Sequence, residues 1–178
     1  MPRCAVLGSP IAHSLSPHLH RAAYAGLGLT GWTYDAVRVA EAGLPAYLDG
    51  LNDTWRGLSL TMPLKRTVLP LLDTLSPVAR AAGAVNTVLL DERGRTGDNT
   101  DVPGAVAAIR ERTDAPVRRA VVLGGGATAG SLVLALAELG CEQVTLLVRD
   151  ATRAAEALAV AERHGGVAVT TGPLEGGP

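Results

Sequence analysis

Apolar residues follow two alternating patterns along the chain. Short apolar runs fit buried β-strands, and they are separated by segments with an apolar residue at every third or fourth position, which is typical of amphipathic helices. In the first third of the sequence, strands are predicted at 3–8, 32–39 and 57–61, and a helix follows Ser16-Pro17 and ends at Gly28. This alternation predicts an α/β protein built on a mostly parallel sheet.

The next stretch of sequence contains shorter elements. Helices are predicted at 44–51, 64–72 and 77–82. The runs 85–90 and 95–98 flank a turn-forming segment, so they are predicted to form a β-hairpin.

The second part of the chain repeats one unit. After a helix at 101–112, strands predicted at 120–123, 143–148 and 167–170 alternate with helices at 127–139 and 151–164. This β-α-β-α-β order is one half of a Rossmann-type domain. We therefore expect a substrate-binding and catalytic domain over 1–101 and a partial nucleotide-binding Rossmann domain over 102–178. A single half leaves an open sheet edge. Residues 171–178 are interpreted as a loop at which the nucleotide-binding domain is cut short.

Composition narrows the class of protein. Apolar residues make up 47% of the 178 and aromatic residues only 3%, so the core must consist of Ala, Val and Leu. A net charge of -1 argues against nucleic-acid binding. No apolar run approaches the roughly 18 residues of a membrane span. The two cysteines lie far apart in the sequence and are expected to be reduced, as in a cytoplasmic protein. Their spacing does not suggest a metal site, so we expect none.

A glycine-rich turn predicts a dinucleotide site. Gly124-x-Gly126-x-x-Ala129 lies between a predicted strand and a predicted helix, and Ala127 and Thr128 begin that helix. Glycine at these points permits a tight turn and a close approach of the backbone to a pyrophosphate at the helix N-terminus.

The end of the next predicted strand bears on the cofactor. Arg149 and Arg153 are suited to clamp the 2′-phosphate of NADP, whereas Asp150 favours the ribose hydroxyls of NAD. The alternative is that both arginines are simply solvated. We expect NADP.

Polar residues in predicted loops form the second candidate site. A lysine near a carboxylate suits general acid–base catalysis. Taken alone, Lys65 would be a solvated lysine and Asp101 a helix N-cap. Together with Thr61, Asn86 and Asn99 they predict a site for a small polar molecule.

Two serines mark a possible anion site. Ser14 and Ser16 flank Leu15, and their hydroxyls precede a helix, which suits a substrate carboxylate. The alternative is that Ser16 only caps the helix.

Four motifs in this order resemble the shikimate dehydrogenase family. They are Ser14-Leu15-Ser16, Ser59-Leu60-Thr61-Met62-Pro63-Leu64-Lys65, Gly83-Ala84-Val85-Asn86-Thr87 and Gly97-Asp98-Asn99-Thr100-Asp101-Val102-Pro103-Gly104. The resemblance covers residues 4–153.

The resemblance implies an oxidoreductase of aromatic amino acid biosynthesis, catalysing the reversible, NADP-linked reduction of 3-dehydroshikimate to shikimate. It implies that Ser14 and Ser16 bind the substrate carboxylate, that Thr61, Lys65, Asn86 and Asp101 surround the ring hydroxyls, and that Lys65 and Asp101 form the catalytic pair. We expect a monomer or homodimer.

The sequence departs from the family at several points. Ser59 stands where the family usually has asparagine, and Val148 and Asp150 replace the asparagine and threonine of its Asn-Arg-Thr cofactor motif. The family's later glutamine and C-terminal helices have no counterpart here. Two alternatives stay open: an NAD-preferring quinate/shikimate dehydrogenase, and a truncated relative that binds without turnover.

Overall fold

The computed structural model describes residues 1–174, which form two compact units. Unit 1 contains Met1–Ser76 and Val85–Asp98, and unit 2 contains Pro77–Ala84 and the chain from Asn99 onward. The contacts thus divide the chain at more than one point, whereas the sequence analysis placed a single boundary after Asp101. The functional roles assigned to 1–101 and 102–178 stay predictions.

Unit 1 is built on a six-stranded sheet with the order β2-β1-β3-β5-β6-β4. Its strands are β1 (Arg3–Gly8), β2 (Thr33–Arg38), β3 (Trp55–Leu60), β4 (Thr74–Leu75), β5 (Thr87–Asp91) and β6 (Gly94–Asp98). β1 runs parallel to both β2 and β3, and β4 runs parallel to β6. β5 is antiparallel to β3 and β6, which confirms the predicted hairpin.

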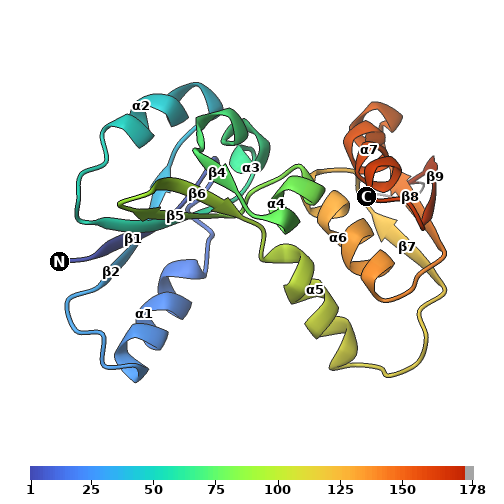
Figure 1. Ribbon diagram of the computed structural model, residues 1–178, viewed down its shortest axis with the longest axis horizontal. Coiled ribbons are helices and arrows are strands. Elements are labelled where there is room, and N and C mark those ends of the chain that lie inside the picture. The colour runs from blue at the N-terminus through green and yellow to red at the C-terminus, as the bar shows by residue number, and fades with distance from the viewer. Residues whose placement is uncertain (175–178) are drawn as a thin grey trace. The chain divides into compact units, whose positions relative to one another are not determined.

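Helices cover both faces of this sheet, with α1 on one face and α2 and α3 on the other (Figure 1). Their bounds are α1 (Ser16–Gly26), η1 (Glu41–Gly43), α2 (Leu44–Asp49), α3 (Leu64–Thr67) and η2 (Leu69–Leu71), where η marks a 3-10 helix. The single helix predicted over 64–72 is wrong, because Pro70 lacks the N–H that a continuous helix needs. α1 also begins one residue earlier than predicted, with Leu15 rather than Ser16 at its N-cap.

Unit 2 has a parallel sheet with the order β7-β8-β9, formed by β7 (Arg119–Leu123), β8 (Gln143–Val148) and β9 (Ala168–Pro173). Its helices are α4 (Pro77–Ala82), α5 (Asp101–Arg110), α6 (Ala127–Glu138), η3 (Ala151–Ala154) and α7 (Ala155–His164). The β-α-β-α-β half of a Rossmann fold is therefore confirmed. Its core consists of Ala, Val, Leu and Cys141, as the composition required.

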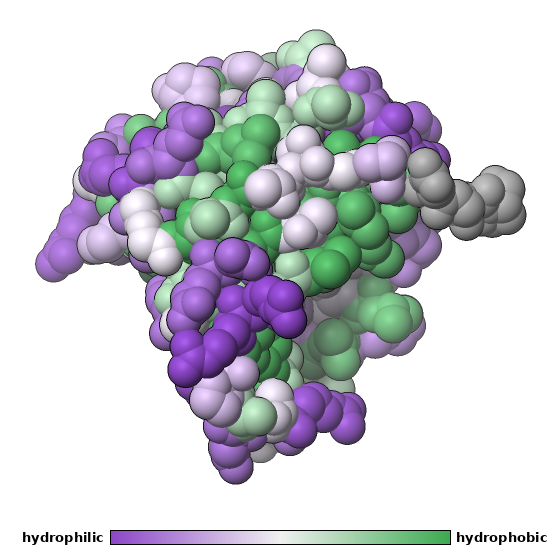
Figure 2. Space-filling model, turned by 90° about the vertical axis from the view of Figure 1, so that its right-hand side faces the viewer, coloured by the Kyte–Doolittle hydropathy of each residue, from purple (hydrophilic) through white to green (hydrophobic). Residues whose placement is uncertain are grey.

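The sheet of unit 2 is open on one side of β7, which pairs only with β8 among residues 1–174. Val121 and Leu123 alternate with the buried Val122 and are 63% and 70% exposed. Figure 2 shows apolar surface among polar residues on the face of the molecule that it presents. The expected open edge is therefore observed within the described chain.

The C-terminal end of the described chain differs from its prediction. Residues 171–173 belong to β9 rather than to a loop, because β9 continues its ladder with β8 as far as Val148↔Pro173. The remainder of the predicted loop, 175–178, lies outside the described residues. Within residues 1–174, no helix combines the length and apolar character needed to cross a bilayer.

Candidate functional site

The turn after β3 is locked to the end of β1. Thr61 N–H donates to the carbonyl of Leu7 at 2.9 Å, and Ser9 N–H donates to the carbonyl of Met62 at 3.0 Å. A side chain at Gly8 would place its Cβ 2.5 Å from Thr61 Cγ2, so only glycine permits this approach. The packing fixes Thr61 where both parallel strands end.

Backbone hydrogen bonds bring Lys65 and Asn86 to the same end of the sheet. Val85 N–H donates to the carbonyl of Lys65 at 2.7 Å, and Leu60 N–H donates to the carbonyl of Asn86 at 2.8 Å. Thr87 Oγ1 donates to Asn86 Oδ1 at 2.9 Å, which orients that amide. Three of the predicted substrate residues, Thr61, Lys65 and Asn86, are therefore positioned by unit 1 itself.

Lys65 is the only lysine among the 178 residues, while the other 15 of the 16 basic residues are arginines. Arginine keeps its charge in proteins, whereas the lysine amine changes protonation readily when its surroundings change. Lys65 is therefore the basic side chain of this sequence that is best suited to proton transfer.

The two predicted carboxylate-binding serines lie where β1 leads into α1. Ser14 Oγ accepts a hydrogen bond from Ser16 N–H at 3.3 Å, so Ser14 satisfies an N–H at the helix start. Ser16 is the first residue of α1 rather than its cap, and Pro17 follows it at the first turn. The alternative reading of Ser16 as the N-cap is wrong, because Leu15 occupies that position.

Tyr34 joins this cluster, although the sequence analysis did not single it out. Its hydroxyl donates to Ser59 Oγ at 2.7 Å. Its ring stacks on His20, with centroids 3.8 Å apart and planes 12° apart, and His20 Nδ1 lies 2.9 Å from the carbonyl oxygen of Ser16. Burial raises the pKa of Tyr34, so its hydroxyl is protonated at neutral pH. In sequence it is indistinguishable from a buried strand residue.

In unit 2, Asn99 holds the segment that carries Asp101. Asn99 is fully buried, and its Oδ1 accepts hydrogen bonds from Asp101 N–H at 3.0 Å and Val102 N–H at 3.3 Å. Its Nδ2 donates to the carbonyl of Ala84 at 3.0 Å and to Ser131 Oγ at 3.1 Å. The alternative reading of Asp101 as the N-cap of α5 is wrong, since Thr100 is the N-cap and Asn99 bonds the first amides.

The predicted cofactor turn has the geometry of a phosphate cradle. Gly124 has φ +108° and donates its N–H to the carbonyl of Leu147 at 2.8 Å, and Gly126 is the N-cap of α6. A Cβ at either glycine would meet no protein atom within 4 Å, so the space beside the turn is open. Ala129 is buried in the core, as expected for close helix–strand packing. These features fit a pyrophosphate at the N-terminus of α6.

Arg149 and Arg153 lie beside this turn. Both are exposed after the end of β8, and a Cβ at Gly125 would lie only 2.7 Å from the carbonyl oxygen of Arg153. Asp150 has a structural role that the sequence analysis missed, because its Oδ1 accepts hydrogen bonds from Thr152 N–H at 2.9 Å and Thr152 Oγ1 at 2.7 Å. These bonds lower the pKa of Asp150, which is therefore ionised at neutral pH.

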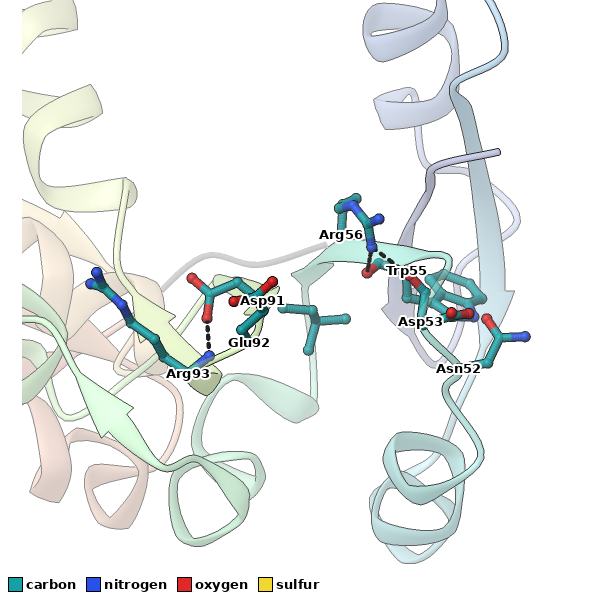
Figure 3. Close-up of a pocket in the computed structure, with 8 residues that line it drawn as sticks. Asn52, Asp53, Trp55, Arg56, Asp91, Glu92 and Arg93 are labelled. Atoms are coloured by element: carbon teal, nitrogen blue, oxygen red, sulfur yellow. Dashed lines mark hydrogen bonds between the residues drawn. The ribbon is translucent and has the colours of Figure 1, made fainter.

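A separate open cavity of about 890 Å³ lies in unit 1 (Figure 3). It is lined by residues before and at the start of β3 and by the β5–β6 turn, among them Trp55, Arg56, Asp91 and Arg93. Arg56 and Asp91 are engaged locally, with Arg56 Nη1 bonded to the carbonyl of Asp53 and Asp91 Oδ1 to Arg93 N–H. The predicted substrate residues Thr61 and Lys65 follow the opposite end of β3.

Comparison with known proteins adds independent support. Residues 6–88 match the family model described as the shikimate dehydrogenase substrate binding domain. A shikimate dehydrogenase (NADP(+)) from Thermus thermophilus is 43% identical over 98% of the chain, and one from Methylobacterium radiotolerans is 42% identical over 90%. The chain is thus similar to shikimate dehydrogenases along nearly its whole length.

Solved structures of shikimate dehydrogenases share the fold. The Mycobacterium tuberculosis enzyme is 38% identical and superimposes with a TM-score of 0.86 over 99% of this chain and 65% of its own length. The Thermus thermophilus enzyme in complex with NADP(H) and shikimate is 40% identical, with a TM-score of 0.83 over 96% of this chain and 63% of its own. The chain spans 59% and 64% of the two curated relatives.

Proposed function

We propose that the protein catalyses the NADP-dependent, reversible reduction of 3-dehydroshikimate to shikimate. The observation that carries the proposal is the arrangement of Thr61, Lys65 and Asn86 at one end of the unit 1 sheet, in a segment that matches the family's substrate binding domain. The named activity of the relatives supports it, as does a neighbour solved with NADP(H) and shikimate.

The proposed roles are those that the resemblance to shikimate dehydrogenases implies. The hydroxyls of Ser14 and Ser16 donate to the substrate carboxylate, and Thr61 and Asn86 bond the ring hydroxyls. Lys65 and Asp101 form the catalytic pair. In shikimate oxidation they accept the proton of the reacting hydroxyl, and in the reverse direction they return it to the carbonyl oxygen.

The cofactor supplies or accepts the hydride that accompanies this proton. The turn from Gly124 to Ala129 would hold its pyrophosphate, with the N–H groups of Ala127 and Thr128 at the start of α6. Arg149 and Arg153 would bond the 2′-phosphate of NADP. Asp150 stays charged beside them, which is the specific observation in favour of the NAD-preferring alternative.

Steady-state oxidation of shikimate by the native protein tests the proposal. The appearance of reduced nicotinamide is followed with NADP+ and NAD+, and with quinate in place of shikimate. Turnover of shikimate with a preference for NADP+ is the expected result. Binding of shikimate without turnover would support a non-catalytic relative, and neither binding nor turnover would refute the proposal. We also propose that the protein is cytoplasmic. We further propose that it is a monomer or homodimer, and sedimentation of the native protein tests this oligomeric state.

A further inference from the structure

Tyr34 on β2 bonds a hydroxyl-bearing residue on β3 that lies 25 residues away in the sequence. Its hydroxyl donates to Ser59 Oγ at 2.7 Å. Its side chain is 2% exposed and is fixed further by stacking on His20. A tyrosine held on its ring face and at its hydroxyl cannot readily reorient.

The direction of the Tyr34–Ser59 bond constrains the Ser59 proton. Burial raises the pKa of Tyr34, so its hydroxyl keeps its proton at neutral pH. In the 2.7 Å bond, the Tyr34 hydroxyl is the donor and Ser59 Oγ is the acceptor. A serine hydroxyl has one proton and two lone pairs. Because one lone pair of Ser59 accepts from Tyr34, its own proton must point to a different acceptor.

The strand register shows on which face of the sheet the Ser59 side chain lies. Val6, Ser59 and Thr87 are neighbours across β1, β3 and β5, and paired residues present their side chains to the same face. Thr61 follows Ser59 by two residues, and so continues that face beyond the end of β3. The neighbours of Ser59 in β3, Leu58 and Leu60, are buried on the opposite face.

We propose that Tyr34 is a positioning residue for substrate binding. It fixes the Ser59 hydroxyl as a donor to an oxygen of the bound ring, on the face that also carries Thr61. This inference rests on the proposed function, and it deepens it by adding the pair Tyr34–Ser59 to the substrate site. Tyr34 acts through Ser59 and takes no part in proton transfer.

The test compares Tyr34→Phe, Ser59→Ala and the double variant in the native protein. Loss of one hydrogen bond should raise KM for shikimate about two- to tenfold. kcat and the KM for NADP+ should stay unchanged. Because both substitutions break the same interaction, the double variant should show no further rise beyond the larger single effect.

Tyr24→Phe is the matched control. Tyr24 belongs to the same aromatic cluster, with its ring centroid 6.1 Å from that of His20, and it packs with Cys4 against the core of unit 1. Both tyrosine variants lose a partly or fully buried hydroxyl, so thermal unfolding of each measures the purely structural effect. Only Tyr34→Phe should raise KM for shikimate.

Three results would overturn the inference: an unchanged KM in Tyr34→Phe, effects of Tyr34→Phe and Ser59→Ala that add in full, or an equal rise in Tyr24→Phe. The wild-type protein is measured first. If it neither binds nor oxidises shikimate, the proposed function fails and the inference fails with it. If the wild type is active and Tyr34→Phe leaves KM for shikimate unchanged, only the inference fails.

Discussion

Asn99 donates a hydrogen bond from Nδ2 to Ser131 Oγ at 3.1 Å, and both side chains are buried, at 0% and 1% exposure. Asn99 lies directly before α5 and Ser131 lies on α6, the helix that begins at the cofactor turn. The bond therefore ties the segment carrying Asp101 to the helix that is proposed to hold the pyrophosphate. It is a buried polar link between two parts of unit 2 with separate chemical roles.

Replacing Asn99 with alanine should lower the free energy of unfolding. The substitution leaves the Ala84 carbonyl and the Asp101 and Val102 amides without this partner, and each unsatisfied buried group costs about 1–3 kcal/mol. We expect the free energy of unfolding to fall by at least about 2 kcal/mol, measured by urea denaturation. Ser131→Ala removes only one of the contacts and should cost about 1 kcal/mol. Equal, negligible effects of the two variants would contradict this role.

Lys65 is expected to carry chemistry rather than substrate affinity. Lys65→Ala should lower kcat at least ~10²-fold, the usual scale for general acid–base catalysis, with a smaller change in KM for shikimate. Lys65→Arg is the matched variant, because it keeps the positive charge but does not release a proton. Both variants should lose kcat to a similar extent. Near-normal kcat in either variant would remove Lys65 from proton transfer.

Ser14 and Ser16 are expected to act on the substrate and not on the cofactor. Replacing both with alanine removes two neutral donors, each worth about 1 kcal/mol, so KM for shikimate should rise about tenfold or more. Initial rates at varied shikimate and at varied NADP+ separate the two effects. An equal rise in both KM values would mean that the serines only shape the start of α1.

Arg149 is expected to set the preference for NADP over NAD. A charge-assisted hydrogen bond is worth about 1.5–3 kcal/mol, so Arg149→Ala should lower the NADP/NAD ratio of kcat/KM about tenfold or more. Arg118→Ala is the control, because Arg118 precedes β7 and is paired with Glu142 at 2.6 Å. A wild-type ratio that favours NAD would contradict the assignment.

The effect of the Asp150 charge on cofactor preference can be tested while Asp150 still caps η3. In Asp150→Asn the amide oxygen can still accept from Thr152, while the negative charge is lost. Because a carboxylate repels a phosphate, the NADP/NAD ratio should rise in this variant. An unchanged ratio would show that Asp150 acts only as the cap of η3.

Local patterns in the sequence predicted most of the fold. The runs at 120–123 and 143–148 are continuous and apolar because parallel strands are covered by helices, and both appear as strands. β4 was missed because two residues carry no periodicity. The segment 77–84 was placed with the first domain because its assignment to unit 2 depends on packing against α6 and α7, which lie more than 40 residues later in the chain.

In the candidate site too, residues within short motifs are predicted from the sequence, whereas contacts between distant segments are not. Lys65, Asn86 and Asp101 are predicted as site residues because each lies within a short motif. Tyr34 was missed because its partner Ser59 is 25 residues away and the pairing arises only when β2 and β3 flank β1. Asp150 was interpreted only through its charge, because the hydrogen bonds from Thr152 depend on the backbone conformation at the start of η3.

The most direct test of the account is a crystal structure of the native protein with shikimate and NADP+. We predict that the shikimate carboxylate lies at the hydroxyls of Ser14 and Ser16 and that Lys65 and Asp101 lie within hydrogen-bond distance of the hydroxyl that is oxidised. Shikimate bound elsewhere, such as in the cavity beside Trp55 and Arg93, with Lys65 and Asp101 both away from it, would contradict the account.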